Sequence, residues 1–79
     1  MNRFDLIEGI IGELELLDFK LFEIGSTLYY VSLKVDYSGM DISPQTMKVL
    51  IHNIIGGRKG DWSLDSTNKY FTILIDLRD

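Results

Sequence analysis

The sequence predicts a two-layer α+β domain in which a four-stranded antiparallel sheet packs against two helices. Three observations predict it: alternating apolar stretches at 17–24 and 27–36, a helix with clear end signals at 43–55, and two further alternating stretches at 61–64 and 70–77. A short helix before the first stretch completes the order αββαββ. With 79 residues, the chain has room for one domain spanning residues 1–79.

The first helix is expected over residues 2–12. Asn2 is a suitable N-cap, and Asp5 in the first turn complements the helix dipole. Apolar side chains recur at helical spacing, at Phe4, Ile7, Ile11 and Leu14. Gly12 is expected to end this helix and release the chain into a strand from Glu13 onward.

Residues 16–36 are expected to form a hairpin with its bend at Gly25-Ser26-Thr27. Tyr29, Val31, Leu33 and Val35 share the face that is expected to meet the core. A two-residue turn at Gly25-Ser26 is the alternative, but it would bring Asp18 and Lys20 onto that face. The three-residue loop is therefore preferred. It aligns Leu21 with Val31, Phe19 with Leu33 and Leu17 with Val35, and it places Asp18 opposite Lys34.

The second half of the chain carries the clearest local signals. Ser43 is expected to cap a helix with Pro44 in its first position, and Gly56-Gly57 is expected to end it. Its apolar stripe comprises Met47, Leu50, Ile51, Ile54 and Ile55. A loop at residues 66–69 would then pair Leu64 with Phe71 and Trp62 with Ile73.

Composition bounds the function classes. The chain is 46% hydrophobic and 25% charged, which is typical of a globular protein, and its net charge of −4 disfavours broad affinity for nucleic acid. The lack of cysteine excludes disulfides and thiolate metal sites, and it fits a reducing compartment. Because no apolar run approaches ~20 residues and residues 1–5 lack a signal-peptide core, a cytoplasmic protein without membrane contact is expected.

Catalytic residues are not indicated. His52 is the single histidine, and the sequence places no partner beside it. Glu13 and Glu15 would share a strand face as surface charge. No nucleophile motif, phosphate-binding loop or metal-ligand spacing is present, so neither an enzyme nor a bound cofactor or metal is expected.

The stretch Gly57-Arg58-Lys59-Gly60, preceded by Ile54-Ile55-Gly56, resembles the Gly-x-x-Gly loop of KH nucleic-acid-binding domains. In that family the loop joins two helices and clamps the backbone of single-stranded nucleic acid, so the resemblance implies a binding loop here. Here a strand is expected to follow the loop. The alternative is therefore a helix C-cap turn whose cations complement the helix dipole.

Two surface features point to a protein partner. Acidic residues crowd the N-terminal third, at Asp5, Glu8, Glu13, Glu15, Asp18 and Glu23. Surplus apolar side chains should lie on the sheet face away from the core, at Phe22, Ile24, Leu28, Tyr30, Tyr70 and Leu74. The alternative is that the first helix covers this face and makes a third layer.

A small non-enzymatic protein that occludes a basic surface on a protein partner is therefore expected. The residues expected to bind it are Glu13, Glu15, Asp18, Phe22, Glu23, Tyr30 and Tyr70. Size and charge would suit a phage or mobile-element inhibitor of a host defence system, similar to an anti-CRISPR protein. One alternative is a nucleic-acid-binding module that uses Lys48, Arg58, Lys59 and Lys69. Another is a homodimer paired through the outer face of the sheet.

Overall fold

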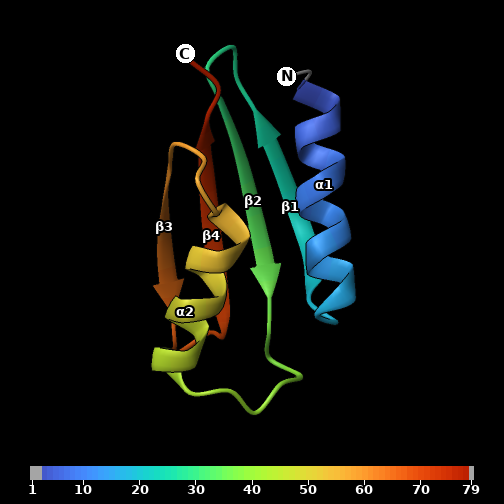
Figure 1. Cartoon of the computed structure of the whole chain (residues 1–79). Helices are drawn as coiled ribbons and strands as arrows, with labels where there is room; N and C mark the ends of the chain where they lie inside the picture. The colour runs from blue at the N-terminus through green and yellow to red at the C-terminus, as the bar shows by residue number, and fades with distance from the viewer. Residues whose placement is uncertain (1–2, 79) are drawn as a thin grey trace.

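The structure, a computed structural model, describes residues 3–78 (Figure 1). Its elements are α1 (Arg3–Leu16), β1 (Lys20–Ser26), β2 (Tyr30–Asp36), α2 (Pro44–Ile55), β3 (Gly60–Asp65) and β4 (Tyr70–Asp76). The four strands form one antiparallel sheet in the order β1-β2-β4-β3. The predicted αββαββ order and α+β class are confirmed.

Both helices pack on the same face of the sheet. The odd-numbered side chains of β2 and β4 are buried against them, whereas the even-numbered ones are half-buried on the other face. The buried core of the described residues comprises Ile10, Leu14, Phe19, Val31, Leu33, Val35, Tyr37, Met47, Ile51, Ile54, Ile55, Phe71, Ile73 and Ile75. The three-layer alternative is therefore wrong, because α1 contributes Ile10 and Leu14 to the same core as α2.

The predicted end of the first helix is wrong, because α1 continues past Gly12 to Leu16. Burial of Leu14 favours the extra turn, and this outweighs the weak helix propensity of glycine. Asp18 ends the helix in the left-handed region, at φ 60, and the Phe19 N–H donates to the Leu14 carbonyl at 3.0 Å. Glu13 therefore lies on a helix and not on a strand. The proposed N-cap, Asn2, lies outside the described residues.

The predicted register of the first hairpin is also wrong. Leu21 lies opposite Val35, Ile24 lies opposite Leu33, and a β-bulge at Phe22 separates the two pairs. Lys34 meets Glu23 at 3.1 Å in place of Asp18.

The bend of this hairpin lies beyond Gly25-Ser26. The Thr27 N–H donates to the Tyr30 carbonyl at 2.8 Å, and the Thr27 hydroxyl accepts from the N–H groups of Tyr29 and Tyr30 at 3.3 and 3.0 Å. The Thr27 side chain thus provides a hydrogen-bond acceptor for the backbone of the bend, and no glycine is needed there. Leu28 and Tyr29 are consequently exposed at the tip, so Tyr29 does not face the core, and Ile24 shares the helix side of the sheet with Leu33.

The predictions for the second half are confirmed. The Ser43 hydroxyl accepts from the Thr46 N–H, Pro44 is the first residue of α2, and Gly56 follows the last one at φ 62. Trp62 pairs with Ile73, and Leu64 pairs with Phe71.

Candidate protein-binding surface

The face of the sheet opposite the helices, called here the outer face, is left uncovered by the described elements (Figure 1). It comprises Lys20, Phe22, Glu23 and Gly25 of β1, Tyr30, Ser32, Lys34 and Asp36 of β2, Tyr70, Thr72, Leu74 and Asp76 of β4, and Asp61, Ser63 and Asp65 of β3. The three predicted partner-binding aromatic residues, Phe22, Tyr30 and Tyr70, all lie on this surface.

The β1 bulge positions the most exposed aromatic side chain of the outer face. It turns Phe22 away from the helices, where 57% of its surface is exposed. The Phe22 and Tyr70 rings meet edge to face, with centroids 5.9 Å apart, so the contact reaches across β2. Two side chains that are distant in sequence thus form one aromatic pair.

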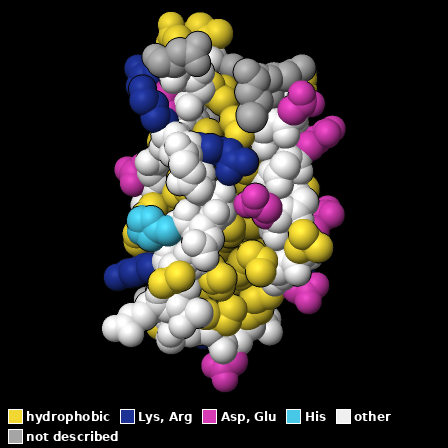
Figure 2. All heavy atoms as spheres, in the orientation of Figure 1, with side chains coloured by type: hydrophobic (Ala, Val, Ile, Leu, Met, Phe, Trp, Pro, Cys, Tyr) yellow, Lys and Arg dark blue, Asp and Glu magenta, His cyan; other side chains and the backbone are white. Residues whose placement is uncertain are grey.

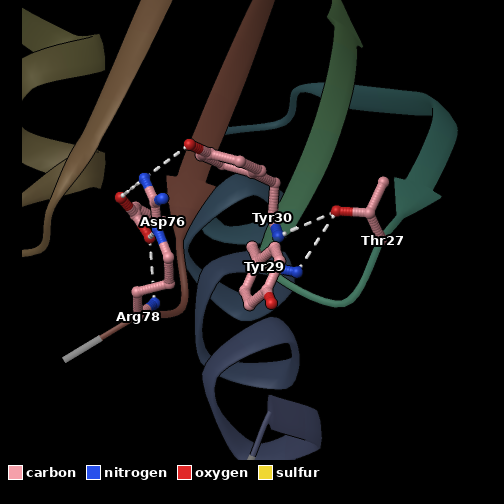
Figure 3. Close-up of polar contacts among 5 residues, drawn as sticks. All are labelled: Thr27, Tyr29, Tyr30, Asp76 and Arg78. Atoms are coloured by element: carbon pink, nitrogen blue, oxygen red, sulfur yellow. Dashed lines mark hydrogen bonds and ion pairs between the residues drawn. The ribbon is translucent and has the colours of Figure 1, made fainter.

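The C-terminal segment fixes the other end of the outer face (Figure 3). The Arg78 guanidinium donates to the Tyr30 hydroxyl at 2.6 Å and to the two carboxylate oxygens of Asp76 at 3.1 and 3.0 Å. It also lies 5.2 Å from the centroid of the Tyr30 ring and 5.8 Å from that of Tyr29. Tyr30 is therefore held in one orientation on the surface.

Hydrogen bonds keep several carboxylates of the outer face ionised. The Arg78 side chain and backbone lower the pKa of Asp76 to about 2. The pKa of Asp36 is lowered chiefly by the Ser38 N–H, and that of Asp65 chiefly by the backbone N–H and side chain of Asn68.

Acidic side chains slightly outnumber basic ones on the outer face. Five carboxylates, of Glu23, Asp36, Asp61, Asp65 and Asp76, lie there with four cations, Lys20, Lys34, Lys59 and Arg78. Glu23 is paired with Lys34 and Asp76 with Arg78, whereas Asp36, Asp61 and Asp65 form no ion pair with another described residue, so these three carboxylates could attract a positively charged surface.

The remaining predicted acidic residues lie elsewhere. Glu13 and Glu15 are on α1, on the other side of the sheet, and Asp18 is in the turn that follows. Figure 2 shows acidic side chains along the outer edge of α1. The predicted partner-binding set is thus divided between two surfaces, because a helix occupies residues that were expected to form a strand.

Two of the four predicted basic residues, Arg58 and Lys59, line one pocket together with Asp76 and Arg78, whereas Lys48 lies on α2 and Lys69 in the loop before β4. Arg58 is used as a cap for α2, since its guanidinium donates to the carbonyls of Ile54 and Ile55 at 3.0 and 3.3 Å. Lys59 and Lys69 flank opposite ends of β3, roughly 20 Å apart for a strand of this length. The Gly-x-x-Gly stretch joins α2 to β3, so the two-helix arrangement that the KH resemblance implied is absent.

No family model matches the chain. No curated protein and no solved structure matches it either.

The histidine, the side chains that can ligate a metal and the helices of residues 3–78 bear on other kinds of site. His52 contacts the Trp62 ring edge to face, with centroids 5.5 Å apart. Within that range no group of three or more metal-ligating side chains is placed to hold an ion, and no helix is long and apolar enough to cross a bilayer.

Asp76 and Arg78 were missed by the sequence reasoning. Their spacing of two residues is visible in the sequence, but their link to Tyr30 depends on the pairing of β2 with β4. Only that pairing brings residues 30 and 76 opposite each other.

Proposed function

We propose that this chain is a non-enzymatic binding protein that uses the outer face to cover a basic surface on a protein partner. The observation that carries the proposal is a sheet with helices on one face only and with Phe22, Tyr30 and Tyr70 on the other. Tyrosine and phenylalanine are enriched at protein interfaces, because they bury a large area at a small cost in side-chain entropy. The carboxylates around them supply orientation and charge selectivity.

Charge supports a foreign partner over a second copy. Two outer faces in contact would bring Asp36, Asp61 and Asp65 of both copies together with fewer cations than carboxylates, so the negative charge would not be fully neutralised. A partner with a lysine- and arginine-rich surface would neutralise this charge.

Proteins that handle nucleic acid carry the most extensive basic surfaces, because they neutralise phosphates. Occlusion of such a surface would make the chain an inhibitor of a nucleic-acid-handling or host-defence machine in the cytoplasm, in the manner of an anti-CRISPR protein.

The experiment compares capture by three tagged proteins from lysate of the host cell. Phe22→Gln removes an apolar anchor of the outer face, and Val49→Gln makes the same kind of change at a site on α2 that is 60% exposed. We expect wild type and Val49→Gln to retain a basic protein that single-stranded DNA displaces, and Phe22→Gln to lose most of it. Equal capture by all three proteins, or capture that a polyanion does not displace, would overturn the proposal.

A further inference from the structure

A second surface, independent of the outer face, lies on the helix side of the sheet. An open groove of about 300 Å³ runs between α1 and α2, and it is lined by Glu13, Leu16, Leu17, Leu50, Asn53 and Ile54. Its walls are mainly leucine and isoleucine, and Leu16 has 87% of its surface exposed. Figure 2 shows hydrophobic side chains gathered between the two helices in the lower half of the view.

The groove exists because the two helices cover different strands. α1 packs over β1, and α2 packs over β3 and β4, so the space above β2 is flanked by helices that run in opposite directions (Figure 1). Leu50, Asn53 and Ile54 are three to four residues apart and so share one flank of α2. Leu16 and Leu17 are both exposed beside this groove and extend its apolar surface, and a contiguous exposed apolar patch is typical of an interaction site.

The charged side chain that lines the groove is acidic. Glu13 stands on its rim, and the other lining residues, Leu16, Leu17, Leu50, Asn53 and Ile54, carry no charge. Arg58, just beyond the end of α2, is engaged by the carbonyls of Ile54 and Ile55. Lys48 faces away from the groove, because it lies one turn before His52 on the same flank of α2, and His52 contacts Trp62 of β3.

We propose that this groove binds an amphipathic helix of a protein partner, with an apolar stripe against the leucines and lysine or arginine residues beside Glu13. A groove between two helices accepts a third helix, whose side-chain ridges fit between those of its neighbours. The inference goes beyond the proposed function, because it concerns the opposite side of the molecule and a different kind of recognition.

A second copy of the chain is a poorer occupant. Two grooves face to face would bring Glu13 near its counterpart and would set one acidic α1 against another. The apolar sides of α1 and α2 that carry Ile10, Leu14, Met47 and Ile51 are already buried in the core, so a second copy could offer only its own groove lining and isolated apolar side chains.

The test uses three synthetic peptides of about 18 residues. The first is a helix with a leucine stripe at the i, i+3, i+4, i+7 positions and lysines on its flanks. The second has glutamate in place of each lysine, and the third has the composition of the first in scrambled order. Binding is measured by calorimetry and by methyl chemical-shift changes in the full chain. We expect only the first peptide to bind, with shifts at Leu16, Leu17, Leu50 and Ile54.

Single substitutions distinguish binding in the groove from nonspecific attraction between the basic peptide and an acidic protein. Leu16→Gln should weaken binding of the first peptide at least tenfold, and Glu13→Gln should weaken it several-fold. Val49→Gln, which alters an exposed α2 site outside the groove lining, should leave it unchanged. Phe22→Gln should also leave it unchanged, so failure of the proposed function would not count against the groove. Equal binding of the scrambled peptide, shifts scattered outside the groove, no binding at all, or a wild-type dimer that Leu16→Gln dissociates would each overturn the proposal.

Discussion

At the scale of single residues, Arg78 links the end of the chain to two strands of the sheet. It lies two residues beyond β4, yet it binds Asp76 through its side chain and backbone and reaches the Tyr30 hydroxyl on β2. The Leu77 N–H adds a bond to the Tyr29 carbonyl at 2.7 Å. The end of the chain is thereby tied to the start of β2, where the outer face carries one of its aromatic residues.

The Asp76 carboxylate should make stability depend on pH in acid. Its pKa is about 2 in the folded protein, against a usual 3.8, because hydrogen bonds from Arg78 favour the ionised form. A lowered pKa stabilises the fold above pH 3.8, and this contribution is lost as the pH falls toward 2. Asp76→Asn should therefore unfold at a lower temperature than wild type at pH 7, and the difference should narrow between pH 4 and pH 2. Thermal unfolding of both proteins across this range is the measurement, and a difference that stays constant would contradict the assignment.

At the scale of elements, local signals predicted α2 and the β3–β4 hairpin correctly because each signal agreed with the packing. Ser43, Pro44 and Gly56 satisfy the ends of a helix whose apolar stripe is also the core stripe. The prediction of the first hairpin was wrong where the local preferences of the sequence disagree with the packing of the core. Gly12 and Gly25 are statistical breakers, but Leu14 is more stable in the core as part of a helix, and Thr27 satisfies the bend without glycine.

The outer face, like the fold, could be predicted from the sequence only in part. Alternation along β2 and β4 was enough to place Tyr30 and Tyr70 on the same face, at opposite ends of the strands. Phe22 reaches this face through a bulge, which the sequence pattern does not predict. The groove between the helices could not be predicted, because it requires α1 to extend to Leu16 and depends on the separation of α1 from α2.

The close approach of β3 and β4 at Gly60 should make this position intolerant of a side chain. A Cβ atom on Gly60 would lie 2.6 Å from the Leu74 carbonyl oxygen and 3.3 Å from the Ile75 Cδ1 atom. Gly60→Ala should therefore destabilise the protein by ~1–3 kcal/mol, as overpacking typically does. The matched control is Gly9→Ala, because a Cβ there meets nothing within 4 Å and alanine favours the helix by up to about 1 kcal/mol. Urea unfolding should move the two variants in opposite directions, and a Gly60→Ala protein as stable as wild type would refute the argument.

At the scale of the whole molecule, the sheet has two open edges, and each is protected in its own way. The bulge at Phe22 interrupts the free edge of β1. Next to β3, the Asp76 N–H donates to the Lys59 carbonyl. Because only alternate residues of an antiparallel strand form hydrogen bonds with a given neighbour, Asp61 is expected to bond to β4, whereas the backbone N–H of Trp62 points away from β4. The Asp61 carboxylate accepts that N–H at 2.8 Å, and the group is thus occupied before another strand can bind it.

Asp61 should therefore keep the chain monomeric. Asp61→Ala frees the Trp62 N–H on a strand edge and removes a negative charge that would repel a second copy, so the variant should self-associate as its concentration rises. Ser63→Ala is the matched control, because Ser63 lies on the same strand and the same face and carries no charge. Sedimentation velocity over a hundredfold range of concentration should show wild type and Ser63→Ala as monomers and Asp61→Ala with a growing population of dimers or larger species. If Asp61→Ala sediments as a monomer at every concentration, β3 is kept from pairing by something other than this carboxylate.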